Sequence, residues 1–134
     1  MANKKQITQN SQSLVVVKPQ EETPNQISPF KALSENLKSI RNSKGVVGYI
    51  IRNKSSAAID LEEPEKLVEY AVFISQVIDS SQEIASQFSI GDVTNVLVEG
   101  KNLNVLNLII KENKINIFLE KDVDHKKIAQ KILL

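Results

Sequence analysis

The chain has 134 residues, of which 41% are hydrophobic, and this size and composition suit one domain with a single core. Seventeen Lys and Arg stand against sixteen Asp and Glu, so charge alone gives no field that would collect nucleic acid or an anionic membrane surface. No cysteine is present, which excludes disulfides, thiolate catalysis and the usual zinc clusters. The apolar runs are too short for a membrane-spanning helix or a signal peptide, so we predict a cytoplasmic protein without membrane insertion.

Residues 1–27 are rich in Gln, Asn, Ser, Thr and Pro and have no apolar period, so we predict a disordered polar tail. The run Leu14-Val-Val-Val17 is an exception because it is prone to form a strand. It could add to an open sheet edge in its own or another molecule. The composition of the tail favours the other interpretation, an adhesive stretch within a disordered segment.

Residues 28–134 are predicted to form the folded domain. Ser28-Pro29 is typical of a helix start, and Phe30, Leu33, Leu37 and Ile40 then form one apolar stripe that predicts a first helix. Gly45 can supply a left-handed residue after it. Two strands follow, at Val46–Arg52 and Ala57–Leu61, and the short polar segment 53–56 predicts a hairpin in which Asn53 takes any left-handed position.

The longest predicted element is a helix from Pro64 to about Phe88. Its apolar arc spans roughly 160°, wider than the stripe of about 100° that is typical of a surface helix. The arc contains Leu67, Tyr70, Ala71, Phe73, Ile74, Val77, Ile78, Ile84, Ala85 and Phe88. Val68 and Val72 lie outside it, on the flank that also carries Asp79 and Ser86.

Three strands are predicted after Gly91, at Val93–Glu99, Leu103–Lys111 and Lys114–Glu120, and Asp124 can cap a last helix. Tight polar turns make these strands antiparallel neighbours. The fold class is therefore α+β, in the order α-β-β-α-β-β-β-α. We expect a five-stranded antiparallel sheet with the long helix on one face and the terminal helices on the other.

This order resembles the roadblock family of dynein light chains and prokaryotic regulators of Ras-like GTPases, with a roadblock/profilin-like fold. Three segments carry the resemblance: Gly45-Val-Val-Gly48 at the first strand, Ser-Ser-Ala-Ala-Ile59 in the second, and Val96-Leu-Val-Glu-Gly100 in the third. The resemblance covers about residues 30 to 134.

The resemblance implies a homodimer that pairs the long helices and the third strands, and that binds a small GTPase or serves as a scaffold. The implied interface lies on one flank of the helix and at the start of the third strand. Its positions in this chain are Val68, Val72, Ser75, Asp79, Val93, Thr94, Asn95 and Val96. A wide apolar arc with valines outside it is typical of a helix that packs both on its own sheet and on a partner.

We predict no catalytic residue, no metal site and no cofactor. His125 stands beside Asp122 and Asp124 without a recognisable ligand or nucleophile motif and is interpreted as a solvent-facing first-turn residue. The glycines lack the lysine of a phosphate-binding loop, so the chain is not itself a GTPase.

The sequence therefore favours a non-enzymatic homodimer that binds a Ras-like small GTPase. The first alternative is a structural subunit of a larger complex that has no direct effect on GTPase activity. The second is a ligand-sensing or enzymatic domain with a polar pocket between the sheet and the first helix.

Overall fold

The computed structural model describes residues 13–17 and 28–133, which form three α-helices, one short 3-10 helix and six strands. The elements are β1 (Ser13–Val17), α1 (Pro29–Arg41), β2 (Val46–Arg52), β3 (Ala57–Leu61), η1 (Pro64–Lys66), α2 (Leu67–Gln87), β4 (Asn95–Glu99), β5 (Asn104–Ile110), β6 (Asn113–Leu119) and α3 (His125–Leu133). The α+β class and the element order predicted for residues 28–134 are confirmed.

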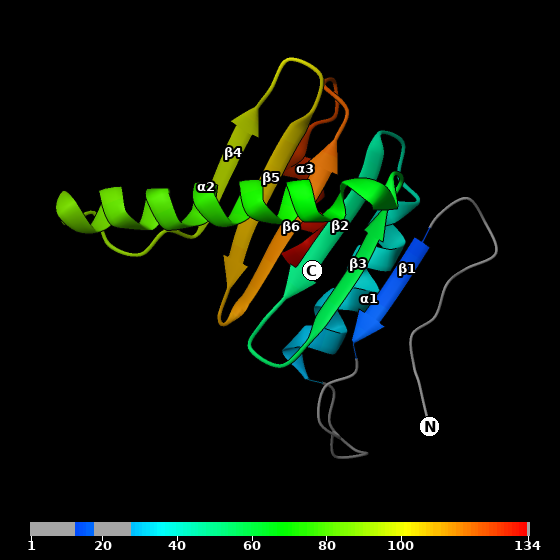
Figure 1. Ribbon diagram of the computed structural model, residues 1–134, viewed down its shortest axis with the longest axis horizontal. Coiled ribbons are helices and arrows are strands. Elements are labelled where there is room, and N and C mark those ends of the chain that lie inside the picture. The colour runs from blue at the N-terminus through cyan, green and yellow to red at the C-terminus, as the bar shows by residue number, and fades with distance from the viewer. Residues whose placement is uncertain (1–12, 18–27, 134) are drawn as a thin grey trace.

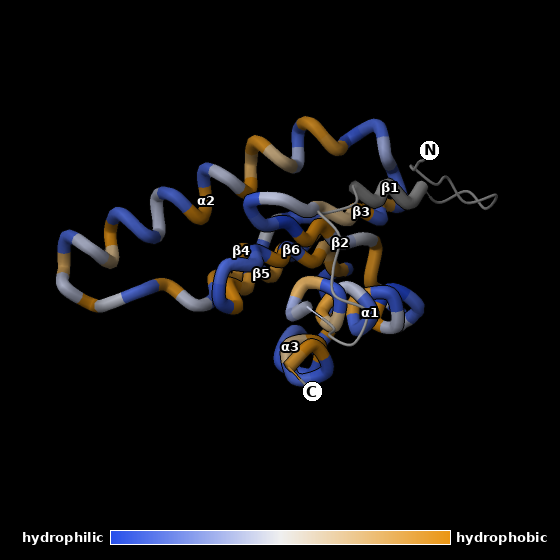
Figure 2. Tube along the Cα trace, turned by 90° about the horizontal axis from the view of Figure 1, so that it is seen from below, coloured by the Kyte–Doolittle hydropathy of each residue, from blue (hydrophilic) through white to orange (hydrophobic). Residues whose placement is uncertain are grey.

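All six strands lie in one antiparallel sheet, in the order β1-β3-β2-β6-β5-β4 (Figure 1). Strands β2 to β6 are the predicted five-stranded sheet. Figure 2 shows α2 on one face of the sheet and α1 and α3 on the other, as expected from the apolar stripes. The two ends of the sheet are therefore β1 and β4.

Strand β1 comes from the segment that the sequence assigned to a disordered tail. Residues Ser13 to Val17 pair with β3 in continuous antiparallel register, from Ser13 opposite Leu61 to Val17 opposite Ala57. The less favoured alternative, addition of this run to an open edge of its own sheet, is the one that the structure adopts. The rest of the predicted tail lies outside the described residues.

Each face of the sheet has its own apolar cluster. Under α1 and α3, the buried cluster contains Leu37, Ile51, Ile117 and Ile132 among others. Under α2, a smaller cluster forms around Ile50, Ile74 and Phe118. Tyr70 of α2 stacks on Phe118 of β6, with ring centroids 4.5 Å apart, and this contact joins the helix to the sheet.

The ends of the helices follow from local hydrogen bonds. The Ser28 hydroxyl accepts a bond from the Lys31 N–H (3.1 Å), and the Asp124 carboxylate accepts one from the Lys126 N–H (3.0 Å), as expected of N-terminal caps. Pro64 opens the 3-10 helix rather than α2 itself, which begins at Leu67. Gly45 has φ +86°, and a Cβ there would lie 2.2 Å from Val123, so both its conformation and its space require glycine.

The turn between β2 and β3 differs from the expectation that Asn53 takes a left-handed conformation. Among the described residues, only Ser89 and Lys111 have positive φ without being glycine. Asn53 instead uses its side-chain oxygen, which accepts bonds from the N–H groups of Ser55 and Ser56 (both 2.9 Å). The side chain thus replaces a backbone carbonyl and closes the hairpin without a left-handed residue.

Candidate protein interface

Helix α2 and the turn after it carry almost all of the large apolar side chains that the described surface exposes. On this segment the side chains of Val68, Val72, Ile84, Phe88 and Ile90 are between 54% and 74% exposed, and Phe73 is 37% exposed. Elsewhere among residues 28–133, only Leu133 joins this group. An apolar surface gathered on one element is typical of a binding site rather than of scattered surface residues.

The C-terminal part of α2 projects beyond β4, so the sheet does not lie under it (Figures 1 and 2). The first half of the helix packs on the sheet through Leu67, Tyr70 and Ile74. Ile78 and Ala85 are the other buried residues of the helix. Ile84 and Phe88, which the sequence placed in the core-facing arc, are exposed. That part of the prediction is wrong because the sheet is narrower than the helix is long.

The exposed apolar residues lie on two flanks of α2. At about 100° per residue, Val68 and Val72 lie on one flank, and Phe73 and Ile84 lie roughly 100° to 160° away around the solvent side. The polar Gln76, between the flanks, is exposed. The helix therefore offers two separate apolar strips, of which the sequence singled out only the first as an interface.

The open edge of the sheet next to α2 is the outer side of β4. The Ile109 N–H donates to the Thr94 carbonyl (2.8 Å) and the Gly100 N–H to the Leu103 carbonyl (2.9 Å). Because backbone groups alternate in an antiparallel ladder, those of Asn95, Leu97 and Glu99 point away from β5. In the described part of the chain no strand pairs with this side, so it can accept another strand.

The predicted interface residues fall into these two regions. Val68, Val72 and Asp79 are exposed on the first flank of α2, and Ser75 is half-buried there. Thr94 and Asn95 are exposed at the start of β4, with Val93 and Val96 half-buried. The structure thus leaves most of these side chains accessible, and it adds Phe73, Ile84, Phe88 and Ile90 as accessible apolar residues.

Two buried asparagines support the open edge from inside the sheet. The Asn116 amide donates to the Asn107 side-chain oxygen (2.7 Å), and the Asn107 amide donates to the Val96 carbonyl (3.0 Å). Asn107 and Asn116 are at most 1% exposed. Buried amides are costly unless they are bonded, so this ladder fixes β6, β5 and β4 in register up to the edge.

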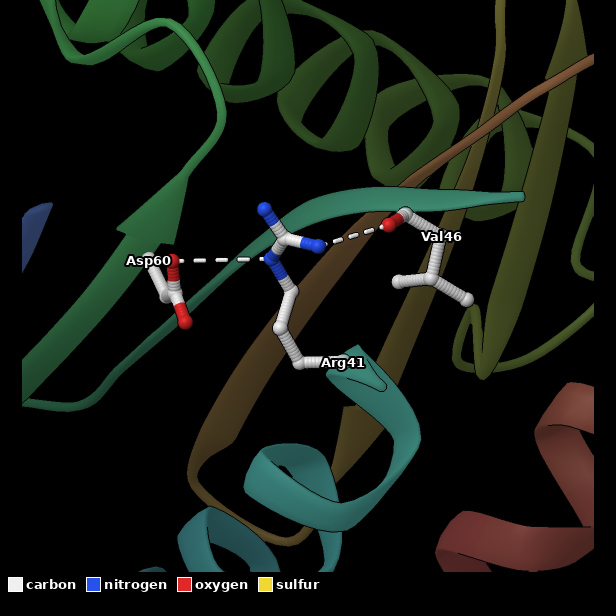
Figure 3. A network of polar contacts seen from close by, with 3 residues as sticks. All are labelled: Arg41, Val46 and Asp60. Carbon is white, nitrogen blue, oxygen red and sulfur yellow. Dashed lines mark hydrogen bonds and ion pairs between the residues drawn. The ribbon is translucent and has the colours of Figure 1, made fainter. Parts of the chain in front are cut away.

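The most buried charged pair lies on the opposite face, at the end of α1 (Figure 3). The Arg41 guanidinium donates to the Val46 carbonyl (2.9 Å) and forms an ion pair with Asp60 (3.5 Å). Burial raises the pKa of the Asp60 carboxyl, and Arg41 opposes that shift. Burial also raises the pKa of Tyr49, which pairs with Asp60 across β2 and β3. Arg41 therefore ties the helix to two strands, which accounts for the cluster without a catalytic role.

The other polar candidates have ordinary surroundings. His125 opens α3 and is half-buried, where the sequence predicted a solvent-facing residue. Glu63, which precedes α2, forms an ion pair with Lys66 (3.2 Å). The hydrogen bond to Glu63 raises the pKa of Lys66. Among the described residues, no three His, Cys, Asp or Glu side chains are grouped to hold a metal ion. Within the same residues, no helix has the length and apolar content to cross a membrane.

Comparison with known proteins rests on structure, since the sequence matches no protein family and no curated protein. The structure is similar to the crystal structure of a Roadblock/LC7 domain from Streptomyces avermitilis, with a TM-score of 0.60. The match covers 78% of this chain and 88% of that one, at 13% sequence identity. The chain has the Roadblock/LC7 fold. The resemblance noted in the sequence is therefore confirmed at the level of the fold.

The Roadblock/LC7 fold places the two accessible regions side by side, on α2 and on the neighbouring end of the sheet. Sequence reasoning found Val68 and Val72 because they depart from the apolar arc. It missed Phe73, Ile84 and Phe88 because they fit the arc, although the excess width of that arc already indicated more apolar surface than one sheet can cover.

Proposed function

We propose that this chain is a non-enzymatic cytoplasmic regulator or scaffold that works as a homodimer and binds a Ras-like small GTPase. One observation carries the proposal: in a Roadblock/LC7 fold, exposed apolar side chains cover both flanks of α2 beside an unpaired strand edge. A monomer gains nothing from exposing these side chains to water, whereas a partner helix would bury them.

The proposed homodimer pairs β4 with β4 of a second copy and brings the two α2 helices together. Asn95, Leu97 and Glu99 supply the unpaired backbone groups, and a two-fold axis lets the same groups of both copies bond each other. The part of α2 that projects beyond β4 would then lie over the partner's sheet. In this arrangement Ile84 and Phe88 gain the cover that their own sheet does not give them.

Self-association is tested by sedimentation of the full chain over a range of concentrations, with Ile84→Glu as the disrupting variant. A buried interface charge without a partner should weaken the dimer by about a hundredfold or more. Gln76→Glu is the matched control, because it adds the same charge to the exposed side of α2 between the flanks. Equal dimer affinity of the two variants, or a monomer at every concentration, would contradict the proposed dimer.

GTPase binding is tested by pull-down with the small GTPases encoded beside the gene, loaded with GDP or a GTP analogue. We expect association that depends on the nucleotide state, and a change in nucleotide turnover if the chain regulates hydrolysis. Val72→Glu, on the other flank of α2, should reduce capture. A stable dimer that captures none of these GTPases and leaves turnover unchanged would instead favour the structural-subunit alternative.

A further inference from the structure

The edge of β3 is a second strand-binding site, at the end of the sheet opposite β4. The Asn53 N–H donates to the Ser56 carbonyl, and the Glu62 N–H donates to the Val47 carbonyl (both 2.9 Å). By the alternation of an antiparallel ladder, Ala58 and Asp60 also turn their backbone groups toward β2. The groups of Ala57, Ile59 and Leu61 therefore face outward and can bond a further strand.

Strand β1 of the same chain pairs with this edge. In the register of β1 and β3, Ser13, Val15 and Val17 stand opposite Leu61, Ile59 and Ala57, so these three residues form the hydrogen-bonded pairs. Leu14 and Val16 turn their backbone groups to the other side. The pairing thus depends on the main chain of alternate residues in a strand of only five.

Main-chain hydrogen bonds between strands do not require that the added strand belongs to the same chain. Eleven residues, 18 to 28, separate β1 from α1, so the strand is attached by a connection rather than by a hairpin turn. Both described core clusters are built from residues between Phe30 and Ile132, so the domain has a core that does not depend on the connection. Another strand of the same chemistry can therefore take the place of β1.

We propose that the β3 edge binds an extended, β-branched apolar segment of another protein, and that Ser13–Val17 occupies it in the resting state as a built-in competitor. The sequence Leu14-Val-Val-Val17 indicates the chemistry of the segment that fits. Because β1 belongs to the same chain as β3, its effective concentration at the β3 edge is in the millimolar range. An external segment therefore binds strongly only when β1 is displaced or weakened, which makes the site regulated.

The test uses the full chain and two proline variants that differ only in which side of β1 loses an N–H group. Val15→Pro removes a donor that points to β3, whereas Val16→Pro removes one that points away from it. The probe is a fluorescein-labelled peptide with the sequence of residues 11–18, and fluorescence anisotropy measures its affinity.

We expect Val15→Pro to bind the peptide about tenfold more tightly than the natural chain or more, because affinity scales with the fraction of open sites. Val16→Pro should behave like the natural chain. Amide exchange measured by NMR should rise at Ile59 in Val15→Pro and stay slow in Val16→Pro. If Val15→Pro does not fold, Val17→Pro breaks the outermost pair and gives the same comparison.

Equal peptide affinity in the natural chain and both variants would overturn the proposal, as would equal exchange at Ile59. Binding that is lost when Ile84→Glu is introduced would also contradict it, because that residue belongs to α2 and not to the β3 edge. The proposal is independent of the dimer and GTPase proposals. A failure here leaves those unaffected, and their failure leaves the β3 edge untouched.

Discussion

The face of the sheet beneath α1 and α3 is closed by side chains such as Leu37, Ile128 and Ile132, each at most 4% exposed, whereas the α2 face is closed over only part of its length. The C-terminal part of the helix passes the end of the sheet, and Ile84 there and Phe88 directly after it are exposed. The difference shows that one face serves the stability of a single subunit. The other leaves apolar side chains exposed, and this is the surface that we propose a second molecule covers.

The largest expected effect comes from a pair of side-chain substitutions, one on each face of the sheet. Leu37→Ala leaves a cavity in a fully buried site and should lower the free energy of unfolding by about 4 kcal/mol. Val68→Ala removes two methyl groups from a side chain that is 74% exposed and should change it by less than about 0.5 kcal/mol in dilute protein. Urea unfolding measures both. Similar losses would mean that α2 is already buried in the subunit.

A smaller effect tests whether the closed face tolerates a broken ion pair. Arg41→Met leaves the Asp60 carboxylate largely buried without its cation, which should cost about 3 kcal/mol. The double variant Arg41→Met with Asp60→Val should recover most of the loss, because no charge is then left alone. If the double variant is as unstable as the single one, the contact of Arg41 with Val46 carries the stability instead.

The pH dependence of the same pair gives a finer test. Burial raises the pKa of Asp60 above its ordinary value of 3.8, so the folded state holds that proton more tightly than the unfolded chain. Its contribution to stability is therefore present below pH 3.8 and is lost as the pH rises through the raised pKa. The free energy of unfolding of the natural chain, relative to Asp60→Asn, should fall from pH 3.8 upward.

Urea titrations of the two proteins at a series of pH values measure this difference. A constant difference across the series would mean that Arg41 cancels the effect of burial. A difference that grows with pH would mean that the ion pair outweighs burial and that the pKa is lowered.

The smallest expected effect concerns the asparagine ladder below α2. Asn107→Ala leaves the Asn116 amide without its acceptor and should cost about 2 kcal/mol, with the largest rise in amide exchange along β4. NMR exchange and urea unfolding together measure this. Unchanged exchange in β4 would show that the backbone ladder alone holds the edge in place.

Sequence reasoning predicted the closed parts of the molecule better than the open ones. The bounds of β2 and β3 agree with the prediction at Val46–Arg52 and Ala57–Leu61, because two short apolar runs joined by a polar turn determine both. Strands β4 to β6 were predicted in order, with ends at most two residues away from those observed. Periodicity identifies which side chains share a face, and this was enough for the layers.

The periodicity of a helix does not show how wide the sheet beneath it is. Ile84 and Phe88 have the spacing of core residues, and only the extent of the sheet leaves them exposed. The buried Asn107 and Asn116 likewise depend on neighbours across three strands, which no local pattern contains. The pairing of Ser13–Val17 was only the less favoured alternative for the same reason, because an open strand edge is a property of the assembled sheet.

The position of β1 also limits how far association through strands can extend. Two copies joined at β4 would present β1 at both outer ends. Strand β1 turns the backbone groups of only two residues, Leu14 and Val16, outward, one fewer than β4, so it is a weaker template for further addition. The assembly then stops at two subunits instead of growing into a fibre. Loss of β1 would expose the β3 edge at both ends of the dimer, and further copies could then add there.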